Sequence, residues 1–436
     1  MPRLDDPLTI GPLQIPNRLY RAPLLECAGN GPEAVDTLIK DLEPAAESGV
    51  GLVFQGATIV TESGGCAAPG MTRVHDDEFV SQLSALTDAI HDHGSTIFVQ
   101  LEHGGLRSME MWHAGYRREH PNERQLAVSR PPWQLRLLDR LGFLHLDPQV
   151  MSTADVYDLA ESFGKAGKRC VDAGYDGIHL AGANMGILQQ FLSPFYNRRD
   201  DEFGDGVRFM ELVHDELRER IGDVPIVTKV PCESPAPPVV QRKLDEWDTV
   251  TLSRRLERIG YDALVPVKTS VVWDMSIVRG EHPKRAWREE SLQDGYADAF
   301  GGRAKTRLVR VLNWLESFQF DFEPAWNAGL ARKVRKSVDV PVLLEGGVRE
   351  RGHMDRLLGD ACDMAGMARP FYAEPKLAAR LLGDVGGDTR VVCENCNNCT
   401  VPQVTGADGR CRTPSVVRRR GEFEKTGAYD ADGDPS

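Results

Sequence analysis

The stretch TADVYDLAESFGKAGKRCVDAG, residues 153–174, is followed almost at once by GIHLAGA, residues 177–183. The first segment opens with Thr, carries apolar residues at helical spacing and closes with Gly, which predicts an amphipathic helix with its own start and stop signals. The second is a short apolar run bounded by glycine, which is typical of a buried strand in a parallel sheet. Together they form one unit of an α/β fold.

The same alternation recurs along the chain. Short apolar runs, each followed by a helix-like stretch, predict eight strands at residues 18–24, 51–60, 96–103, 177–183, 225–231, 263–268, 341–347 and 364–370. Eight such units over about 370 residues predict a (β/α)8 barrel with insertions, since a bare barrel needs about 250 residues. A doubly wound sheet is the structural alternative.

Two long segments interrupt the alternation, at residues 104–152 and at roughly 270–326. Both follow the C-terminal ends of predicted strands, which form the catalytic face of a barrel. The second is polar and aromatic, so it either lies over the mouth or decorates the surface. The predicted organisation is a barrel over residues 1–385 and a cysteine-rich tail over residues 386–436.

Composition narrows the class of protein. The chain has 65 acidic and 52 basic residues and a net charge of −13, which argues against nucleic acid as a partner. No apolar run approaches the roughly 20 residues of a membrane span, and the N-terminus lacks a signal peptide, so we expect a cytoplasmic protein without a membrane partner. Thiols stay reduced there, so the nine cysteines do not predict a disulfide framework.

Glycines end the last two predicted strands, in EGG (345–347) and GMARP (366–370). Barrels commonly bind a phosphate between these two loops, where glycine lets backbone N–H groups approach the ligand. Arg369 adds a cation. The pattern predicts a phosphorylated ligand, although glycines also end strands for purely geometric reasons.

Five segments resemble, in order and spacing, the signatures of the old yellow enzyme family of FMN-dependent oxidoreductases. They are NRLYRAPLL (17–25), GATIV (56–60), VQLEHGG (99–105), AGYDGIHLAGANMGILQQFLSPFYNRRDDEFGD (173–205) and DMAGMARPFYAEPKL (363–377). The resemblance covers about residues 7–382. A cysteine cluster after MARPF is most similar to the 2,4-dienoyl-CoA reductase and trimethylamine dehydrogenase branch. There the barrel binds FMN, the tail carries a four-iron four-sulfur cluster, and a further region, absent from this chain, binds a second nucleotide.

The resemblance implies a set of flavin contacts. It places Ala22, Pro23 and Leu24 along the flavin edge, Ala57 near a carbonyl, Gln100 on the pyrimidine edge, and Gly346, Gly347, Ala368 and Arg369 around the phosphate. Lys229 falls where the family usually has an arginine beside the flavin, and it would supply a positive charge without the arginine fork. The alternative for Lys229 is a buried amine paired with a neighbouring carboxylate.

The resemblance also reveals departures at the substrate side. Ala181 stands where the family has a substrate-anchoring histidine, and Gly186 where it has the proton-donating tyrosine, whereas Asn184 is retained. Leu106 replaces the expected arginine, with Arg107 one step later, and Leu25 replaces a flavin-tuning residue. Losing the histidine and the tyrosine puts the reduction of activated alkenes in doubt.

Other residues could replace the missing acid. Asp274 lies roughly where the dienoyl reductase branch has a catalytic histidine, but it could also cap a helix. Tyr196 and His179 are candidates too, although Tyr196 could be a packing aromatic and the alternation around His179 points it toward the helices. His103 matches a retained family position, with a structural hydrogen-bonding role as the alternative.

Four cysteines crowd the tail as C-x2-C-x2-C-x11-C, formed by Cys393, Cys396, Cys399 and Cys411. Thiolates this close can surround one metal centre. Four thiolates suit an iron-sulfur cluster or a structural zinc, and a free or vestigial cluster is the third reading.

The sequence thus predicts a cytosolic FMN-dependent oxidoreductase that moves electrons between NAD(P)H, or a redox partner protein, and a small organic substrate. One alternative is an amine or methyl-group dehydrogenase that uses an iron-sulfur cluster as its electron port. Another is a flavin-free, phosphate-binding barrel with a structural metal. The sequence leaves the substrate open, and also whether the chain forms a homo-oligomer.

Overall fold

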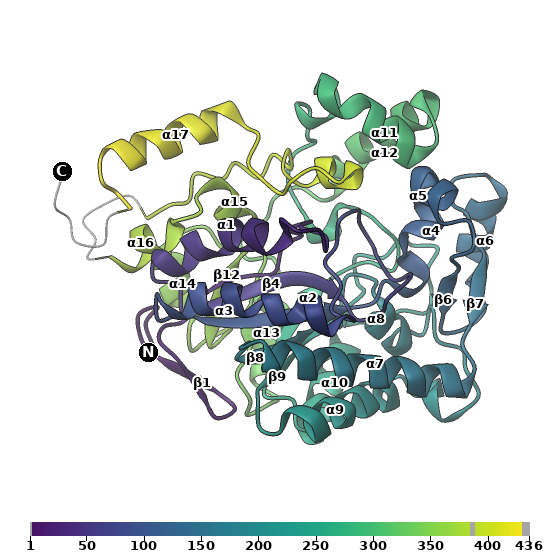
Figure 1. Ribbon diagram of the computed structural model, residues 1–436, viewed down its shortest axis with the longest axis horizontal. Helices are drawn as coiled ribbons and strands as arrows, with labels where there is room; N and C mark the ends of the chain where they lie inside the picture. The colour runs from purple at the N-terminus through teal and green to yellow at the C-terminus, as the bar shows by residue number, and fades with distance from the viewer. Residues whose placement is uncertain (1, 384–388, 430–436) are drawn as a thin grey trace.

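The computed structural model describes residues 2–383 and 389–429 (Figure 1). Its main sheet has eight parallel strands, β3 (Leu19–Arg21), β4 (Leu52–Ile59), β5 (Thr96–Glu102), β8 (Gly177–Leu180), β9 (Ile226–Cys232), β10 (Ala263–Lys268), β11 (Leu343–Leu344) and β12 (Met364–Met367). β12 pairs with β3, and the Leu264 N–H donates to Pro341 O at 3.0 Å to join β10 to the β11 segment. The sheet is therefore closed. The predicted (β/α)8 barrel is confirmed, because a doubly wound sheet would leave two free edges.

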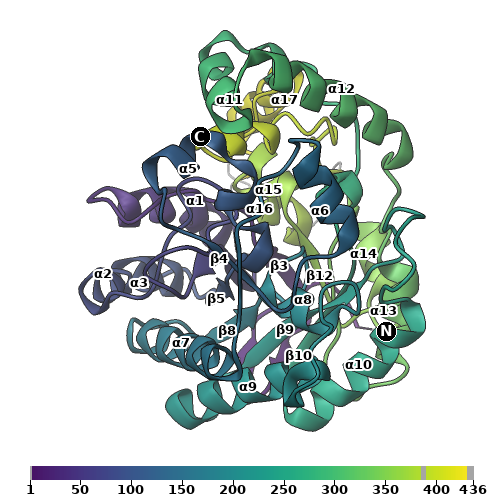
Figure 2. The same cartoon turned by 90° about the vertical axis from the view of Figure 1, so that its right-hand side faces the viewer.

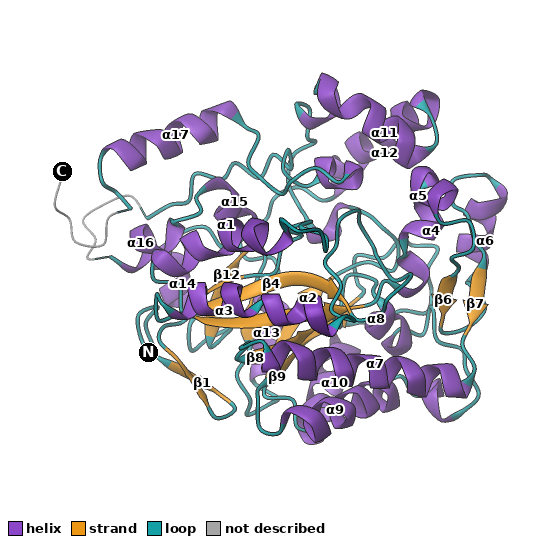
Figure 3. Ribbon diagram, in the orientation of Figure 1, coloured by secondary structure: helices purple, strands orange, loops and turns teal. Residues whose placement is uncertain are grey.

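Helices enclose this barrel (Figure 3). The outer ring contains α1 (Ala34–Glu47), α2 (Asp77–Gln82), α3 (Ser84–His91), α7 (Thr153–Asp172), α9 (Val207–Ile221), α10 (Glu246–Ile259), α13 (Ala328–Arg335) and α14 (Arg351–Leu357). α7 begins at the predicted residue because Ser152 and Asp155 form a reciprocal capping box. Its apolar positions, among them Leu159 and Phe163, are buried against the sheet.

The barrel interior is a second core, separate from the layer between strands and helices. Tyr20, Phe54 and Phe98 meet edge to face inside it, with ring centroids 5.5 and 5.6 Å apart. A hairpin of β1 (Leu8–Ile10) and β2 (Leu13–Ile15) inserts Ile10 and Ile15 into the same cluster. The hairpin, for which the sequence predicts no element, therefore closes the end of the barrel where the strands begin.

The two insertions lie at the opposite end, around the barrel mouth (Figure 2). The first contains η1 (Gly105–Arg107), α4 (Met109–Trp112), α5 (Ala114–Glu119), β6 (Gln125–Ala127), α6 (Trp133–Arg140) and β7 (Pro148–Val150). The second contains η3 (Met275–Ile277), η4 (Ala286–Arg288), η5 (Glu290–Leu292), α11 (Gln293–Phe300) and α12 (Arg303–Gln319). An ion pair between Arg118 and Asp298 joins them.

Two short helices connect the barrel to the tail. α15 (Arg369–Ala373) follows β12 directly, and α16 (Leu377–Leu382) comes next. The tail contains η6 (Val401–Thr405) and α17 (Pro414–Lys425), and in Figure 1 α17 runs above α15 and α16. The predicted boundary between barrel and tail, at residues 385 and 386, lies outside the described residues. Over the described ranges, no helix is both long and apolar enough to cross a membrane.

Candidate active site

Alternate side chains of the barrel strands point into the barrel near its mouth. Gln100 on β5 and His179 on β8 are paired in register, and Gln100 Nε2 donates to His179 Nδ1 at 3.2 Å. The His179 ring also lies against Phe54, with centroids 4.7 Å apart. The prediction that His179 faces the helices is wrong, because Ile178 and Leu180 take the helix-facing positions and strand alternation turns the residue between them inward.

The pairing with Gln100 fixes the proton on His179. An amide nitrogen only donates, so Nδ1 accepts and the proton of the neutral ring sits on Nε2. Burial, and then the charge of Lys229, hold the pKa of His179 well below its ordinary value. Nε2 has no hydrogen-bond partner among the described residues. His179 therefore holds a buried, unpartnered N–H donor inside the barrel.

Lys229 on β9 is buried, and its Nζ lies 2.5 Å from Glu345 Oε1 across the barrel. Glu345 immediately precedes the two glycines that follow β11. The structure thus shows the pairing that was the alternative for Lys229. Its charge still acts on the site, because it lowers the pKa of both His179 and Glu102. Contact of Lys229 with a flavin stays a prediction.

The predicted flavin edge is built where the chain leaves β3. The Ala22 N–H donates to Met367 O at 2.9 Å, so this segment lies beside β12. Leu24 crosses directly over Gly56, where an added Cβ would come within 1.3 Å of Leu24 O. Gly56 and the half-buried Ala57 lie in a bulge, at which the register between β4 and β5 shifts. The structure therefore brings Ala57 beside residues 22–24.

The predicted phosphate end requires glycine. Gly346 and Gly347 have φ of +101° and +76°, and added Cβ atoms would lie 2.7 Å from the Trp326 ring and 2.5 Å from Glu323 O. Within the described ranges, the backbone N–H groups of Gly346, Gly347 and Ala368 donate to no acceptor. Because β11 and β12 are neighbours, these donors gather at one place and form a cradle for an anion.

The two arginines near this cradle differ in what they contact. The Arg369 guanidinium donates to Asn397 in the tail, to Val278 O at 3.3 Å and to Arg279 O at 2.9 Å, so it joins the tail to the second insertion. Arg349 was missed by the sequence reasoning, and its signal was its position two residues after the glycine pair. Its Nε and Nη1 are buried without a partner in the described part of the chain, and burial lowers its pKa. The guanidinium also lies over the Phe322 ring, 5.3 Å from its centroid, and interacts with the Cys393 thiol. Its two unpartnered nitrogens, near a cradle of N–H groups that donate to no described acceptor, fit an anionic group such as the FMN phosphate.

The loop after β8 is held in a strained conformation. Asn184 and Met185 have φ of +67° and +66°, which residues with a Cβ rarely adopt. Arg107 stabilises the turn, because its Nη1 donates to Asn184 O at 2.6 Å while facing Glu102 Oε1 at 3.4 Å. This holds the half-buried Asn184 at the mouth, and its catalytic role stays a prediction.

Glu102, the last residue of β5, is a second residue that the sequence reasoning missed. Its signal was an acid at the end of an otherwise apolar strand. It is 5% exposed, and burial raises its pKa, an effect that Arg107 and Lys229 oppose. A Cβ on Gly186 would lie 3.2 Å from Glu102 Oε1, so this carboxyl stands beside the position where the tyrosine is missing.

The other candidate proton donors form hydrogen bonds with the backbone of neighbouring loops. His103 Nδ1 accepts the Gly105 N–H at 3.0 Å, and burial lowers the pKa of His103 to about 4. Asp274 accepts the Ser276 N–H at 2.9 Å and so caps η3, while burial raises its pKa. Tyr196 donates to Val271 O as a packed aromatic. Catalytic roles for His103 and Asp274 stay predictions.

Cys393, Cys396, Cys399 and Cys411 line a single cavity in the tail, together with Arg369 and Tyr372. Burial raises the pKa of the Cys399 thiol to about 12 and also raises that of Cys411. In the described ranges, no three ligand-type side chains lie close enough together to hold a single metal ion. The four cysteines therefore share one cavity, and what they bind stays a prediction.

Comparison with known proteins shows what the chain is similar to. A metal reductase from Desulforamulus reducens is 25% identical over 90% of this chain and 50% of its own length. A 4,4'-dithiodibutanoate disulfide reductase from Rhodococcus erythropolis is 24% identical over 96% of this chain and 97% of its own. The solved structure of an old yellow enzyme homologue from Zymomonas mobilis has a TM-score of 0.62 at 19% identity, covering 95% of this chain and 98% of that one.

The chain spans about half the length of the metal reductase and of several other curated relatives. Residues 3–300 match the model of a family of FMN-dependent oxidoreductases, and the barrel resembles that of an old yellow enzyme homologue. These two findings confirm the resemblance to the old yellow enzyme family. On that match, the chain belongs to the NADH:flavin oxidoreductase / NADH oxidase family.

Proposed function

We propose that this protein is an FMN-dependent oxidoreductase that passes electrons from NAD(P)H to a small organic substrate at the barrel mouth. The observation that carries the proposal is the set of N–H donors on Gly346, Gly347 and Ala368 that have no acceptor among the described residues, near the Nε and Nη1 of Arg349, which have no hydrogen-bond partner there. When bound, FMN supplies a centre that takes up a pair of electrons as a hydride and passes them on. Reduced thiols and a nicotinamide donor fit a cytoplasmic protein.

The chain's own residues bind and orient the flavin in this proposal. The glycine N–H groups hold its phosphate, and the small side chains of Ala22 and Ala57 let its ring approach the strands. Gln100 Oε1 and His179 Nε2–H offer an acceptor and a donor to the ring edge, since the Gln100 amide nitrogen is already engaged. Lys229 supplies a positive charge that favours the reduced ring.

On the substrate side, we assign proton holding to Glu102. Its buried carboxyl has a raised pKa, so it keeps a proton more readily than an exposed glutamate does. It lies beside Gly186, at the side where the family has its tyrosine. Arg107 holds both Glu102 and the Asn184 turn in place.

We assign the cysteine cavity to an iron-sulfur cluster. Four cysteines that line one cavity supply the four thiolates on which an iron-sulfur cluster is held, and a structural zinc is the alternative that metal analysis excludes or supports. The cavity adjoins α15 through Arg369, so the cluster would connect the flavin to an electron-transfer partner. Anaerobically purified protein should contain about four irons per chain, whereas stoichiometric zinc would contradict this assignment.

The flavin site is tested by Gly347→Ala. The new Cβ would lie 2.5 Å from Glu323 O at a positive φ, so the cradle must distort and FMN should be lost. Gly352→Ala is the matched control, because its Cβ would meet only Arg356, at 3.7 Å. The readouts are FMN per chain and the melting temperature of the flavin-free protein. FAD in the wild type, or full FMN in Gly347→Ala, would overturn the proposal.

A second candidate function, oxidation of an amine with electrons leaving through the cluster, is favoured by the acids near the mouth. Burial, and then the charge of Asp274, raise the pKa of Glu316, and Glu102 is buried at the end of β5. Carboxyls in such a place could attract a cationic amine. Anaerobic mixing separates the two functions, since flavin bleached by NAD(P)H supports reduction and flavin bleached by an amine alone supports oxidation. The metal reductase and the disulfide reductase support the first function, whereas a relative named N,N-dimethylglycine/sarcosine dehydrogenase, from Chromohalobacter salexigens and 25% identical over 95% of this chain and 53% of its own length, supports the second.

A further inference from the structure

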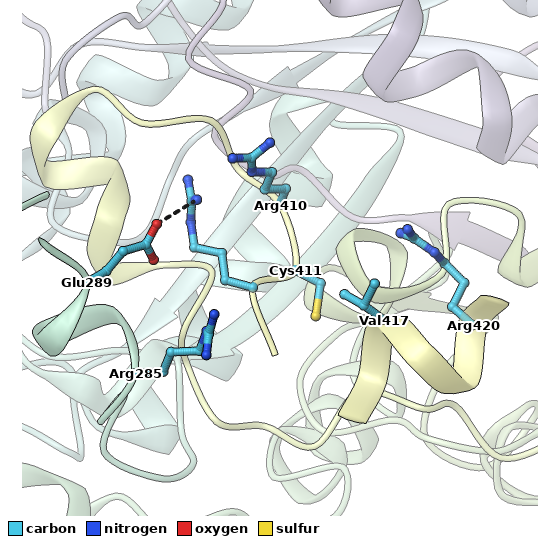
Figure 4. Close-up of a pocket in the computed structure, with 7 residues that line it drawn as sticks. Arg285, Glu289, Arg410, Cys411, Val417 and Arg420 are labelled. Atoms are coloured by element: carbon cyan, nitrogen blue, oxygen red, sulfur yellow. Dashed lines mark ion pairs between the residues drawn. The ribbon is translucent and has the colours of Figure 1, made fainter. Parts of the chain in front are cut away.

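A second cavity, of about 370 Å³, lies between the second insertion and the tail (Figure 4). Four arginines line it, Arg285 from the second insertion and Arg410, Arg412 and Arg420 from the tail. Cys411 lines both cavities. Its volume falls in the range of small-molecule sites.

The cavity carries an excess of positive charge. Glu289 is the carboxylate in its lining, and it stands 3.7 Å from Arg412. Arg420 is paired with Glu424 at 3.3 Å. The side chains of Arg285 and Arg410 make no hydrogen bond or ion pair with any described residue. Arg412, whose side chain is 8% exposed, has a buried Nε without a partner in the same part of the chain.

We propose that this cavity binds a polyphosphate group, either free or as part of a nucleotide. Guanidinium groups match phosphate oxygens with paired N–H donors, and several of them suit adjacent phosphates better than a single carboxylate. The site differs from the flavin cradle, which uses glycine N–H groups. A ligand bound here lies against the outer side of Cys411.

The rival explanation is that the arginines only offset the charge of four thiolates. On that reading the arginines stabilise the tail, and no external anion binds. The two explanations differ in whether the holoprotein takes up a ligand and in what an arginine substitution removes, the ligand or the metal.

The test is calorimetric titration of the anaerobically purified holoprotein with pyrophosphate, ADP and adenosine at low salt. Wild type should bind pyrophosphate and ADP, and adenosine should give no signal. Arg285→Ala and Arg410→Ala should each weaken binding on the order of tenfold while iron content stays unchanged. Arg418→Ala, an exposed arginine on α17 outside the cavity, is the matched control and should bind as wild type does.

Tighter binding of ADP than of pyrophosphate would identify a nucleotide as the ligand, and equal binding would identify the phosphates alone. Absence of pyrophosphate binding to wild type would overturn the proposal. Unchanged affinity in both variants would also overturn it, and so would loss of iron in them without loss of anion binding.

A different observation concerns α12, which buries polar side chains and exposes apolar ones, the reverse of an ordinary amphipathic helix. Its buried positions are polar, since Thr306 donates to Tyr296 O at 3.2 Å and Asn313 accepts from Trp287 Nε1 at 3.0 Å. Its outward face is apolar, with exposed fractions of 43% for Leu308, 51% for Val311, 51% for Leu315 and 69% for Phe318. These four follow the a and d spacing of a coiled coil, and the two buried positions fall opposite them.

We infer that this face binds the same face of a second copy of the chain, in antiparallel orientation. The first turns of α12 are cationic, with Arg303, Lys305 and Arg307, whereas Glu316 lies in its last turn and Asp321 follows the helix. An antiparallel pair therefore places the cationic end of each helix beside the acidic end of the other. A parallel pair would bring like charges together.

Sedimentation equilibrium tests this inference, with a dimer expected for wild type. Leu315→Glu should yield a folded monomer, because the side chain is exposed in the single chain and its loss leaves no cavity. Trp247→Glu on α10, where Trp247 is 71% exposed, is the control and should stay dimeric. Under oxidation, a mixture of Val311→Cys and Leu315→Cys chains should crosslink faster than either variant alone. A monomeric wild type at high micromolar concentration would overturn the inference, as would a dimeric Leu315→Glu.

Discussion

In the proposed function, single residues at the mouth determine which reductions are possible. Ala181 and Gly186 remove the anchor and the proton donor, so we expect slow turnover of simple cyclic enones. Gly186→Tyr alone should help little, because its Cβ would lie 3.2 Å from Glu102 Oε1 and the carboxyl would have to move. Combined with Glu102→Ala, the new tyrosine should raise enone turnover by up to about 10²-fold.

Anaerobic stopped-flow rates of flavin reoxidation by an enone measure this effect. Glu102→Ala alone is the control, and it should turn over more slowly than wild type if Glu102 holds the proton. Wild-type rates equal to those of the double variant would show that another group already donates it.

A buried acid in the first insertion predicts a pH-dependent stability. Glu110 is 1% exposed, both of its carboxylate oxygens lack a partner in the described ranges, and burial raises its pKa to about 7. The folded state therefore holds a proton that the unfolded state releases from about pH 4.5 upward. The corresponding stability is fully present below pH 4.5 and is lost as the pH rises to about 7.

Glu110→Gln removes this loss, because the amide stays neutral. At pH 8 the variant should exceed wild type by up to about 3 kcal/mol in the free energy of unfolding, and at pH 4 the two should be similar. Urea denaturation across this range measures the difference, with the exposed Glu119→Gln as the control. A difference that does not vary with pH would contradict the assignment.

Among the secondary-structure elements, the N-terminal hairpin has a purely structural role. Ile10 and Ile15 are fully buried among the side chains of the barrel interior, at the end far from the flavin site. Ile10→Ala or Ile15→Ala should cost about 2–5 kcal/mol of stability, since each leaves a cavity. FMN content should not change. Gln14→Ala, at an exposed position of the same hairpin, is the control, and chemical denaturation with a flavin assay checks both points.

The strands and the hairpin differ in how far the sequence predicts them. Eight buried strands appear as apolar runs because parallel strands lie between the helices and the barrel interior, and each predicted range overlaps an observed strand. The hairpin has strands of three residues and breaks at Pro and Gly, so it offers no periodicity to detect. The outward apolar face of α12 is hidden for another reason, because periodicity shows an amphipathic helix but not which face is covered.

The same limit explains the errors at the site. The glycines after β11 could be predicted, because the reason for them is local backbone conformation. His179 could not be oriented correctly from its neighbours, since the mouth of this barrel accepts polar side chains on its inner face. Glu102 and Arg349 each leave only a weak local signal, an acid at a strand end and a cation after the glycine pair. Their significance depends on Gly186 and on the tail, which lie far from them in the sequence.

For the whole molecule, the tail and the barrel are joined where the two proposed cofactors would meet. Arg369 links α15 to Asn397 in the tail, and Ala368 beside it belongs to the phosphate cradle. A second link joins the tail to the segment after β11, where the Val391 N–H donates to Arg349 O at 3.0 Å. The segment after the glycine pair therefore also contacts the tail, and a cluster in the cysteine cavity would lie one short helix away from the flavin phosphate.

This arrangement predicts that the two cofactors can be separated by one substitution. Cys396 lines the cysteine cavity, and among the described residues its Sγ forms a hydrogen bond with Thr413 Oγ1 at 2.9 Å. Cys396 belongs neither to the glycine cradle nor to a barrel strand. Cys396→Ser should therefore lose its iron, and its broad absorption near about 400 nm, but keep FMN. NAD(P)H should still bleach the flavin, while turnover with a one-electron acceptor should fall sharply, because electrons then leave only from the flavin.

Cys170→Ser, a buried thiol on α7 in the opposite wall, is the control and should keep both cofactors. If Cys396→Ser loses FMN together with iron, the tail is part of the flavin site itself; if it transfers single electrons as fast as wild type, the cysteine cavity is not on the electron path.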